Sequence, residues 1–238
     1  MPTRSHRDTG RRPGETRFCP APADLGAHES VAAAETPTAW CWSSGKRALD
    51  LVLGFASLPI VIPLTAVLGA ISAVVYRANP LFRQTRRGVD EEQFAVIKIR
   101  SLPASFPERH GKHDIHHHEF TGWSRFLRQS HLDELPQIVN ILCGSMSIVG
   151  PRPMIDEVID QLEPIDRTTR SMVKPGLSGP WQISTMGSVA LHDHPELDNA
   201  YVEHASFVGD VRIIWLTFQT MLGRPALEPS ALLRRLGW

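Results

Sequence analysis

A run of 26 residues without a charge, from Leu51 to Tyr76, constrains this chain more than any other feature. About 20 apolar residues are enough to cross the hydrocarbon core of a bilayer. The run has no polar face, which the core helix of a soluble protein would present to solvent. The sequence therefore favours a helix that lies in a membrane.

Two prolines, Pro59 and Pro63, fall in the middle of this run. Each proline removes a helical hydrogen-bond donor and disfavours the helical turn before it. We expect the hydroxyl of Ser57 or Thr65 to satisfy the freed carbonyls.

Basic residues flank both ends of the run, with Lys46 and Arg47 before it and Arg77 after it. By the positive-inside rule, both ends then lie on the cytoplasmic face. We expect residues 46–78 to form a re-entrant helix that enters one leaflet, breaks at the prolines and returns. A simple membrane span is the alternative.

Composition divides the rest of the chain into three parts. Residues 1–45 are rich in Pro, Ala, Arg, Ser and Thr without periodicity, which predicts a disordered basic N-terminal tail. We expect one domain over 46–224 and a C-terminal tail over 225–238. Because 25 basic residues balance 25 acidic ones, no overall field favours nucleic acid, and any anion site must be local.

Short periodic segments predict the fold class, which is mainly α with a few short strands (α+β). Residues 94–100 alternate as a strand does, and residues 123–128 and 135–141 have helical patterns, the latter ending at Gly144. The apolar segment 211–222 is too short to span and is expected to lie in the interface with Trp215 at headgroup depth. We expect a compact domain joined to the membrane helix and to interfacial amphipathic helices.

The adjacent acids Asp133 and Glu134 are the first candidates for chemistry. Neighbouring side chains on a helix point about 100° apart, so one acid can face a substrate and the other a metal. The structural alternative is a helix start, with Ser130 as N-cap and both acids in the first turn. The two interpretations are compatible.

Several cations accompany the acids. Arg152 lies between Pro151 and Pro153, a rigid turn that prepares its guanidinium for a bidentate phosphate contact. Three arginines within residues 83–87 form either an electropositive wall for phosphates or a solvated patch. The histidine-rich residues 105–120 lack defined ligand spacing, which favours an exposed loop over a zinc site.

Taken in order, these motifs resemble the bacterial sugar transferase domain of the monotopic phosphoglycosyl transferases over roughly Lys46 to Arg224. The motifs are Lys46-Arg47 with Asp50, the proline-containing apolar run, Gln84 with Arg86 and Gly88, Lys98-Ile99-Arg100-Ser101, Leu132-Asp133-Glu134-Leu135-Pro136-Gln137, Met146 to Pro153, and Lys174-Pro175-Gly176-Leu177-Ser178-Gly179.

The resemblance implies a reaction, its place in the cell and its partners. A sugar 1-phosphate moves from a nucleotide sugar, expected to be a UDP-sugar, to polyprenyl (undecaprenyl) phosphate. This step begins exopolysaccharide, capsule, O-antigen or glycan assembly. It implies the cytoplasmic membrane, with the catalytic domain on its cytoplasmic face and lipid as a partner. A homodimer and downstream glycosyltransferases are further partners left open.

The resemblance also implies roles for residues. Asp133 is the nucleophile that forms a phospho-aspartyl intermediate, and Glu134 binds Mg²⁺. Substrate and phosphate binding is expected of Arg128, Arg152, Arg86, Lys98, Arg100, Lys174 and Gln182.

Three departures from the family pattern concern the helix break and the substrate. Ile62 replaces a small polar residue before Pro63, Glu119 falls where an Asp-Pro-Arg run is usual, and residues 184–187 replace an Asn-Gly-Arg segment. They leave an alternative, a catalytically weakened membrane-anchored relative that acts as an assembly partner. The sugar, nucleotide, pathway and oligomeric state stay open.

Overall fold

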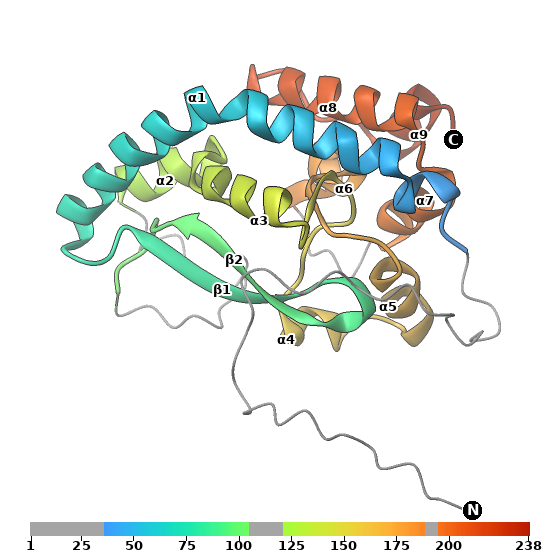
Figure 1. Ribbon diagram of the computed structural model, residues 1–238, viewed down its shortest axis with the longest axis horizontal. Coiled ribbons are helices and arrows are strands. Elements are labelled where there is room, and N and C mark those ends of the chain that lie inside the picture. The colour runs from blue at the N-terminus through green and yellow to red at the C-terminus, as the bar shows by residue number, and fades with distance from the viewer. Residues whose placement is uncertain (1–35, 105–120, 189–194) are drawn as a thin grey trace, which may run out of the picture.

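The structure is a computed structural model that describes residues 36–104, 121–188 and 195–238, and it has the expected mainly helical fold with short strands (Figure 1). The expectations for residues 1–35, for the histidine-rich segment and for Glu119 lie outside these ranges. The α-helices are α1 Ser44–Tyr76, α2 Gly122–Gln129, α3 Ile138–Cys143, α4 Asp156–Ile159, α5 Pro164–Ser171, α6 Pro180–Ile183, α7 Glu196–His204, α8 Phe207–Met221 and α9 Pro229–Leu236; the strands are β1 Leu81–Arg87, β2 Gln93–Ile99, β3 Ser147–Val149 and β4 Gly176–Ser178; the 3-10 helices are η1 Ala39–Trp42, η2 Val89–Glu91, η4 Leu132–Gln137 and η5 Thr185–Ser188.

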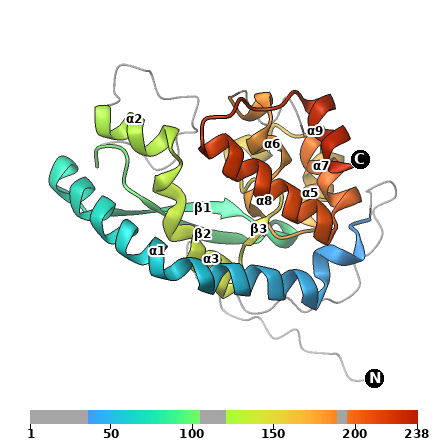
Figure 2. The same cartoon turned by 90° about the horizontal axis from the view of Figure 1, so that it is seen from above.

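Helix α1 is one continuous helix of 33 residues with both prolines inside it. Figure 1 shows it as a shallow arch over the rest of the molecule, and Figure 2 shows it along one side while α5–α9 gather at one end. The Ser57 hydroxyl donates to the carbonyl of Gly54 at 2.7 Å, one residue before the Phe55 carbonyl that Pro59 leaves without its usual donor. Among the described residues the Thr65 hydroxyl has no hydrogen-bond partner. The expected role of these hydroxyls at the prolines is therefore wrong.

Much of α1 presents apolar side chains to the outside. Val74 is 78% exposed, Ile60 70% and Val52 64%. Its most apolar window has a mean hydropathy of 2.3 and is only 17% buried. Within the described ranges it is the one helix long and apolar enough, by length and composition, to cross a membrane. A contiguous apolar surface of this kind needs a cover.

The first turns of α1 are joined to the rest of the fold by buried polar contacts. The Lys46 ammonium donates to Asp210 Oδ2 at 2.7 Å, to the Tyr201 hydroxyl at 2.9 Å and to the Val149 carbonyl at 3.0 Å. One turn later, Asp50 Oδ1 accepts from the amide of Ile148 at 2.9 Å. These contacts connect the apolar helix to β3, α7 and α8.

Strands β1 and β2 form an antiparallel hairpin (Figure 1), which confirms the strand expected over residues 94–100. In its register Arg86 pairs with Phe94, and Phe82 pairs with Lys98. Because Val96 and Ile99 are buried, the strand is anchored in the core, and it carries Lys98 at a fixed position.

Strands β3 and β4 form a short parallel pair that requires glycine at its end. Val149 pairs with Ser178, and the next residue, Gly150, lies against Gly176. A Cβ on Gly176 would lie 2.1 Å from the Gly150 nitrogen, and a Cβ on Gly150 would lie 2.4 Å from the Lys174 carbonyl. Only glycine allows two backbones to approach so closely. This contact fixes where the Pro151–Pro153 turn begins.

Both expected tails contribute to the core where the structure describes them. The C-terminal residues form α9, whose Leu232 is fully buried and whose Leu236 is 3% exposed. At the other end η1 places Cys41 in the same hydrophobic cluster. The core therefore extends past both expected boundaries, 45 and 224.

Candidate active site

The acid pair lies on the 3-10 helix η4, not on an α-helix that begins at Ser130. Ser130 is the C-cap of α2, and its hydroxyl donates to the Phe126 carbonyl at 2.7 Å, so the expected N-cap is wrong. His131 follows with φ 56°, in the left-handed region, and turns the chain into η4. Asp133 and Glu134 are 7% and 8% exposed. The pair is thus placed by a reversal between two helices.

Glu134 is held by two cations from distant parts of the chain. Its Oε1 accepts from Lys98 Nζ of β2 at 2.9 Å and from Arg152 Nη2 at 3.1 Å. These side chains line an open pocket of about 240 Å³. The residues around the pocket are Arg86, Val96, Lys98, Glu134, Gln137, Arg152, Pro153, Gly176 and Leu177.

The two acids have different proton affinities. Burial, and next the charge of Glu134, raise the pKa of Asp133 to about 6, against the opposing effect of Lys98, Arg128 and Arg152. Burial alone would also raise the pKa of Glu134, but Lys98 and Arg152 outweigh it and hold that pKa well below its usual range. The pair therefore combines a permanent anion with a more basic carboxylate that is ionised at neutral pH.

Two further arginines, Arg86 and Arg128, add positive charge around the acid pair. Arg86 donates to Gln84 Oε1 at 2.6 Å and to the Pro153 carbonyl at 3.3 Å. Burial and the nearby Arg152 lower the pKa of Arg86 to about 9, which leaves it protonated at neutral pH. Burial also lowers the pKa of Arg128, while the charges of Asp133 and Glu134 oppose that effect. Four cations around two carboxylates favour an anionic ligand.

Two predicted cations lie elsewhere. Arg100 donates to the Asn79 carbonyl at 2.8 Å, and its guanidinium lies 5.6 Å from the centre of the Phe82 ring. Lys174 lies beside Arg47 at the end of α3: a Cβ on Gly144 would be 3.7 Å from its Nζ and 3.6 Å from Arg47 Nη2. Neither residue is brought to the acid pair.

Gln182 and its neighbour Trp181 lie on α6. Both polar atoms of the Gln182 amide are buried and have no hydrogen-bond partner among the described residues. Trp181 was not predicted as a site residue, yet its ring centre lies 5.8 Å from the Arg152 guanidinium, within cation–π range. The sequence feature that could have indicated Trp181 is its position after a Gly-Pro pair and next to the predicted site residue Gln182.

The acid pair fits magnesium only in part. In the part of the chain that the structure describes, no three His, Cys, Asp or Glu side chains group in a way that could hold a metal ion. Magnesium usually takes one or two carboxylates and completes its shell with water and substrate phosphates. Asp133 and Glu134 match the protein's share of such a set, provided that the ligand supplies phosphate.

The fold thus combines a buried carboxylate pair, with four cations around it, and one long helix with an exposed apolar surface. The chain belongs to the bacterial sugar transferase family, whose model matches residues 41–224. This confirms the resemblance drawn from the motifs.

Curated relatives share about a third of the residues. The UDP-glucose:undecaprenyl-phosphate glucose-1-phosphate transferase of Escherichia coli (strain K12) is 34% identical over 183 residues, which are 72% of this chain and 39% of that protein. The uncharacterized sugar transferase EpsL of Bacillus subtilis (strain 168) is 32% identical over 151 residues, 63% of this chain and 73% of that protein. The chain thus spans about two fifths of the first relative and most of the second.

Proposed function

We propose that this protein is a phosphoglycosyl transferase that moves a sugar 1-phosphate from a UDP-sugar to undecaprenyl phosphate at the start of polysaccharide assembly. The observation that carries the proposal is the buried Asp133, whose pKa near 6 leaves it ionised at neutral pH beside four cations. The names of relatives support the substrates, including a UDP-N-acetylgalactosamine-undecaprenyl-phosphate N-acetylgalactosaminephosphotransferase of Aeromonas hydrophila that is 30% identical.

The chemistry takes two displacements at one phosphorus. A carboxylate oxygen of Asp133 attacks the phosphorus nearer the sugar, and the bond from this phosphorus to the bridging oxygen breaks. The nucleoside monophosphate leaves with that oxygen, and the sugar phosphate stays on Asp133 as an acyl phosphate. A phosphate oxygen of undecaprenyl phosphate then attacks the same phosphorus and releases the Asp133 carboxylate. No net proton transfer is required.

The surrounding residues bind and orient the phosphates. Arg128, Arg152, Arg86 and Lys98 offer charged donors to a diphosphate whose charge shifts as the bond breaks. With the phosphates bound, Glu134 would hold Mg²⁺, which supplies neutralisation of the phosphate charge. Gln182 is kept as a substrate contact, whereas Arg100 and Lys174 have no part in this proposal.

The membrane elements would place this site at the leaflet surface, where a polyprenyl phosphate presents its headgroup. We propose that α1 is re-entrant, with both ends on the cytoplasmic face, because its flanks are basic and its surface is apolar. Helix α8 exposes Trp215 by 58% and Phe218 by 52%, which fits a helix lying in the interface. The nucleotide sugar then arrives from the cytoplasm and the lipid from the side.

A turnover assay tests the proposal. Membrane fractions that contain the protein are given undecaprenyl phosphate, Mg²⁺ and a panel of UDP-sugars, and UMP release is measured. Asp133→Asn is expected to lower turnover by roughly a thousandfold or more, since it removes the nucleophile. The matched control is Asp156→Asn. The Asp156 side chain is 40% exposed, and its Oδ1 pairs with Arg87 Nε at 2.6 Å. Binding without turnover in the native protein would support the assembly-partner alternative.

A further inference from the structure

The main chain of Arg152 is held from both sides by two residues that the sequence did not point to. Asp198 of α7 accepts the Arg152 amide proton, with Oδ2 3.3 Å from the nitrogen. Arg170 of α5 donates from Nη2 to the Arg152 carbonyl at 2.5 Å and to Asp198 Oδ2 at 3.0 Å. One ion pair therefore satisfies both the donor and the acceptor of a single residue.

This ion pair is buried. The side chains of Asp198 and Arg170 are 1% and 8% exposed. Burial raises the pKa of Asp198 to about 6, although Arg170 opposes the effect. Because burying two charges costs much of what their attraction returns, such a pair is weak evidence for a stabilising role. Its geometry points instead to the residue that it holds.

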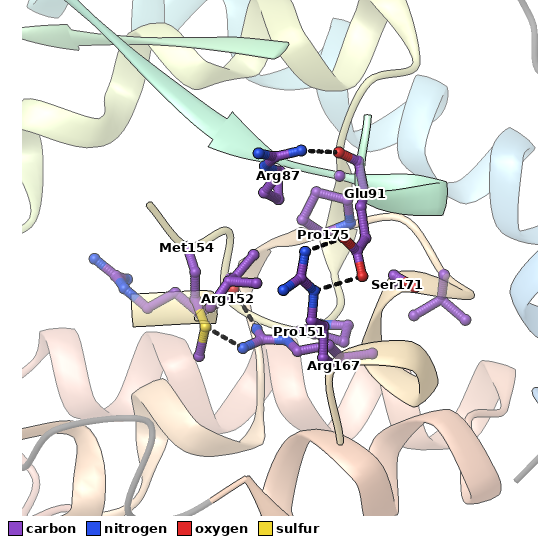
Figure 3. Close-up of a pocket in the computed structure, with 12 residues that line it drawn as sticks. Arg87, Glu91, Pro151, Arg152, Met154, Arg167, Ser171 and Pro175 are labelled. Carbon is purple, nitrogen blue, oxygen red and sulfur yellow. Dashed lines mark hydrogen bonds and ion pairs between the residues drawn. The ribbon is translucent and has the colours of Figure 1, made fainter. Parts of the chain in front are cut away.

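Both the side chain and the backbone of Arg152 are restrained. Its guanidinium reaches Glu134 at 3.1 Å and lies over Trp181, while Pro151 and Pro153 restrict its backbone. Arg152 and Met154 also line a second pocket of about 320 Å³ (Figure 3). Arg170, which lines the same pocket, contacts the sulfur of Met154. The ion pair thus contacts the main chain of Arg152, and the acid pair contacts its guanidinium through Glu134.

We propose that Arg170 and Asp198 are positioning residues that act through Arg152, setting the direction from which its guanidinium meets the substrate phosphate. The inference rests on the proposed function, because it assigns Arg152 to the phosphate. A misplacement of about 1 Å at a reacting centre can lower a rate by about a hundredfold, so a support of this kind has a measurable effect.

The first test is a double-mutant cycle on turnover. Arg170→Lys keeps the charge but loses the planar fork that bonds Asp198 and Arg152 together. We expect it to lower kcat/KM by roughly tenfold. In an Arg152→Lys background the same change should cost less than about twofold, because residues that act through one another are not additive. Equal losses in both backgrounds would overturn the proposal.

Arg167→Lys is the matched control. Arg167 lies on the same helix and pairs with Glu91, with its Nε 2.6 Å from Glu91 Oε1 (Figure 3), without a hydrogen bond to Arg152. We expect its turnover to equal that of the native protein.

The second test does not depend on turnover. Between Pro151 and Met154 only Arg152 and Met154 carry amide protons, so hydrogen exchange of this peptide reports on the held residue. Exchange should be faster in Asp198→Asn and Arg170→Lys than in the native protein and in Arg167→Lys, with thermal unfolding measured beside it. Unchanged exchange would overturn the proposal. If the native protein shows no turnover, the proposed function fails, and exchange still decides whether the ion pair holds Arg152.

Discussion

Asp133 and Glu134 are neighbours in the chain whose pKa values move in opposite directions, up to about 6 for Asp133 and well below the usual range for Glu134. Both are buried, so burial cannot be the cause of the difference. The cause is that Lys98 and Arg152 both bond to Glu134. Such a separation is consistent with the different roles proposed for the two acids.

The first prediction concerns pH. In the proposed mechanism Asp133 attacks only when ionised, and its pKa is raised, so the fraction of active protein is expected to fall as pH drops through about 6. We expect kcat/KM to be level above about pH 7 and to decline tenfold per pH unit well below pH 6. A pH profile of UMP release between pH 5 and 8.5 measures this. A level profile down to pH 5 would contradict it.

The second prediction concerns the acid limb of this pH profile, that is, its decline at low pH. Removing the charge of Glu134 and removing the charge of Lys98 should shift this limb in opposite directions. The Glu134 carboxylate raises the pKa of Asp133, and the Lys98 ammonium lowers it. Glu134→Gln should therefore shift the acid limb to lower pH, and Lys98→Met should shift it to higher pH. Each change should also reduce the rate by roughly ten- to a hundredfold, because charge that stabilises the reaction is lost. Shifts in the same direction would show that another group controls the limb.

The third prediction concerns the prolines of α1. Proline inside a helix costs about 3 kcal/mol, so Pro59→Ala with Pro63→Ala favours a straighter helix that spans the bilayer. A cysteine at Ala78, in a chain whose three native cysteines are serine, reports the side of the membrane. We expect a membrane-impermeant maleimide to label it in intact cells only in the alanine variant.

A cysteine at Ser44 is the control for this labelling. It lies at the other end of the helix and should stay protected in both variants until the cells are permeabilised. Labelling of the Ala78 site in the native sequence would contradict the re-entrant arrangement.

The fourth prediction tests the C-terminal helix. Leu232 is fully buried, so Leu232→Ala should lower the free energy of unfolding by about 2–5 kcal/mol. Leu222→Ala is the control, since Leu222 is 69% exposed and its truncation should change stability by less than about 0.5 kcal/mol. Denaturant unfolding of the protein in nanodiscs measures both. Equal effects would mean that α9 does not belong to the core.

Features that depend on local pattern could be predicted from the sequence. The uncharged run predicted α1, and alternation predicted the strand that carries Lys98. For α1 and this strand, neighbouring residues contain the information. The grouping of Arg128, Arg152 and Lys98 with Asp133 and Glu134 joins distant residues, and the family resemblance implied it.

Features that depend on the path of the chain could not be predicted. The sequence around Ser130 predicts an N-cap. In the structure His131, although it is not a glycine, adopts the left-handed region, and the next helix, η4, begins after it. Arg100 is two residues from Lys98, yet β2 ends at Ile99 and Arg100 turns to Asn79 instead. The hydrogen bonds of Arg170 and Asp198 to Arg152 join three segments of the chain, and the spacing of these residues in the sequence does not predict them.

The buried bonds of Lys46 and Asp50 have a practical consequence. Deleting α1 to obtain a water-soluble catalytic fragment would leave Asp210 without its ammonium partner and the Ile148 amide without its acceptor. An unpaired buried charge is strongly destabilising. The apolar helix is therefore a structural part of the fold rather than a detachable tether, and assays of this protein should keep α1 and supply detergent or lipid to cover its apolar surface.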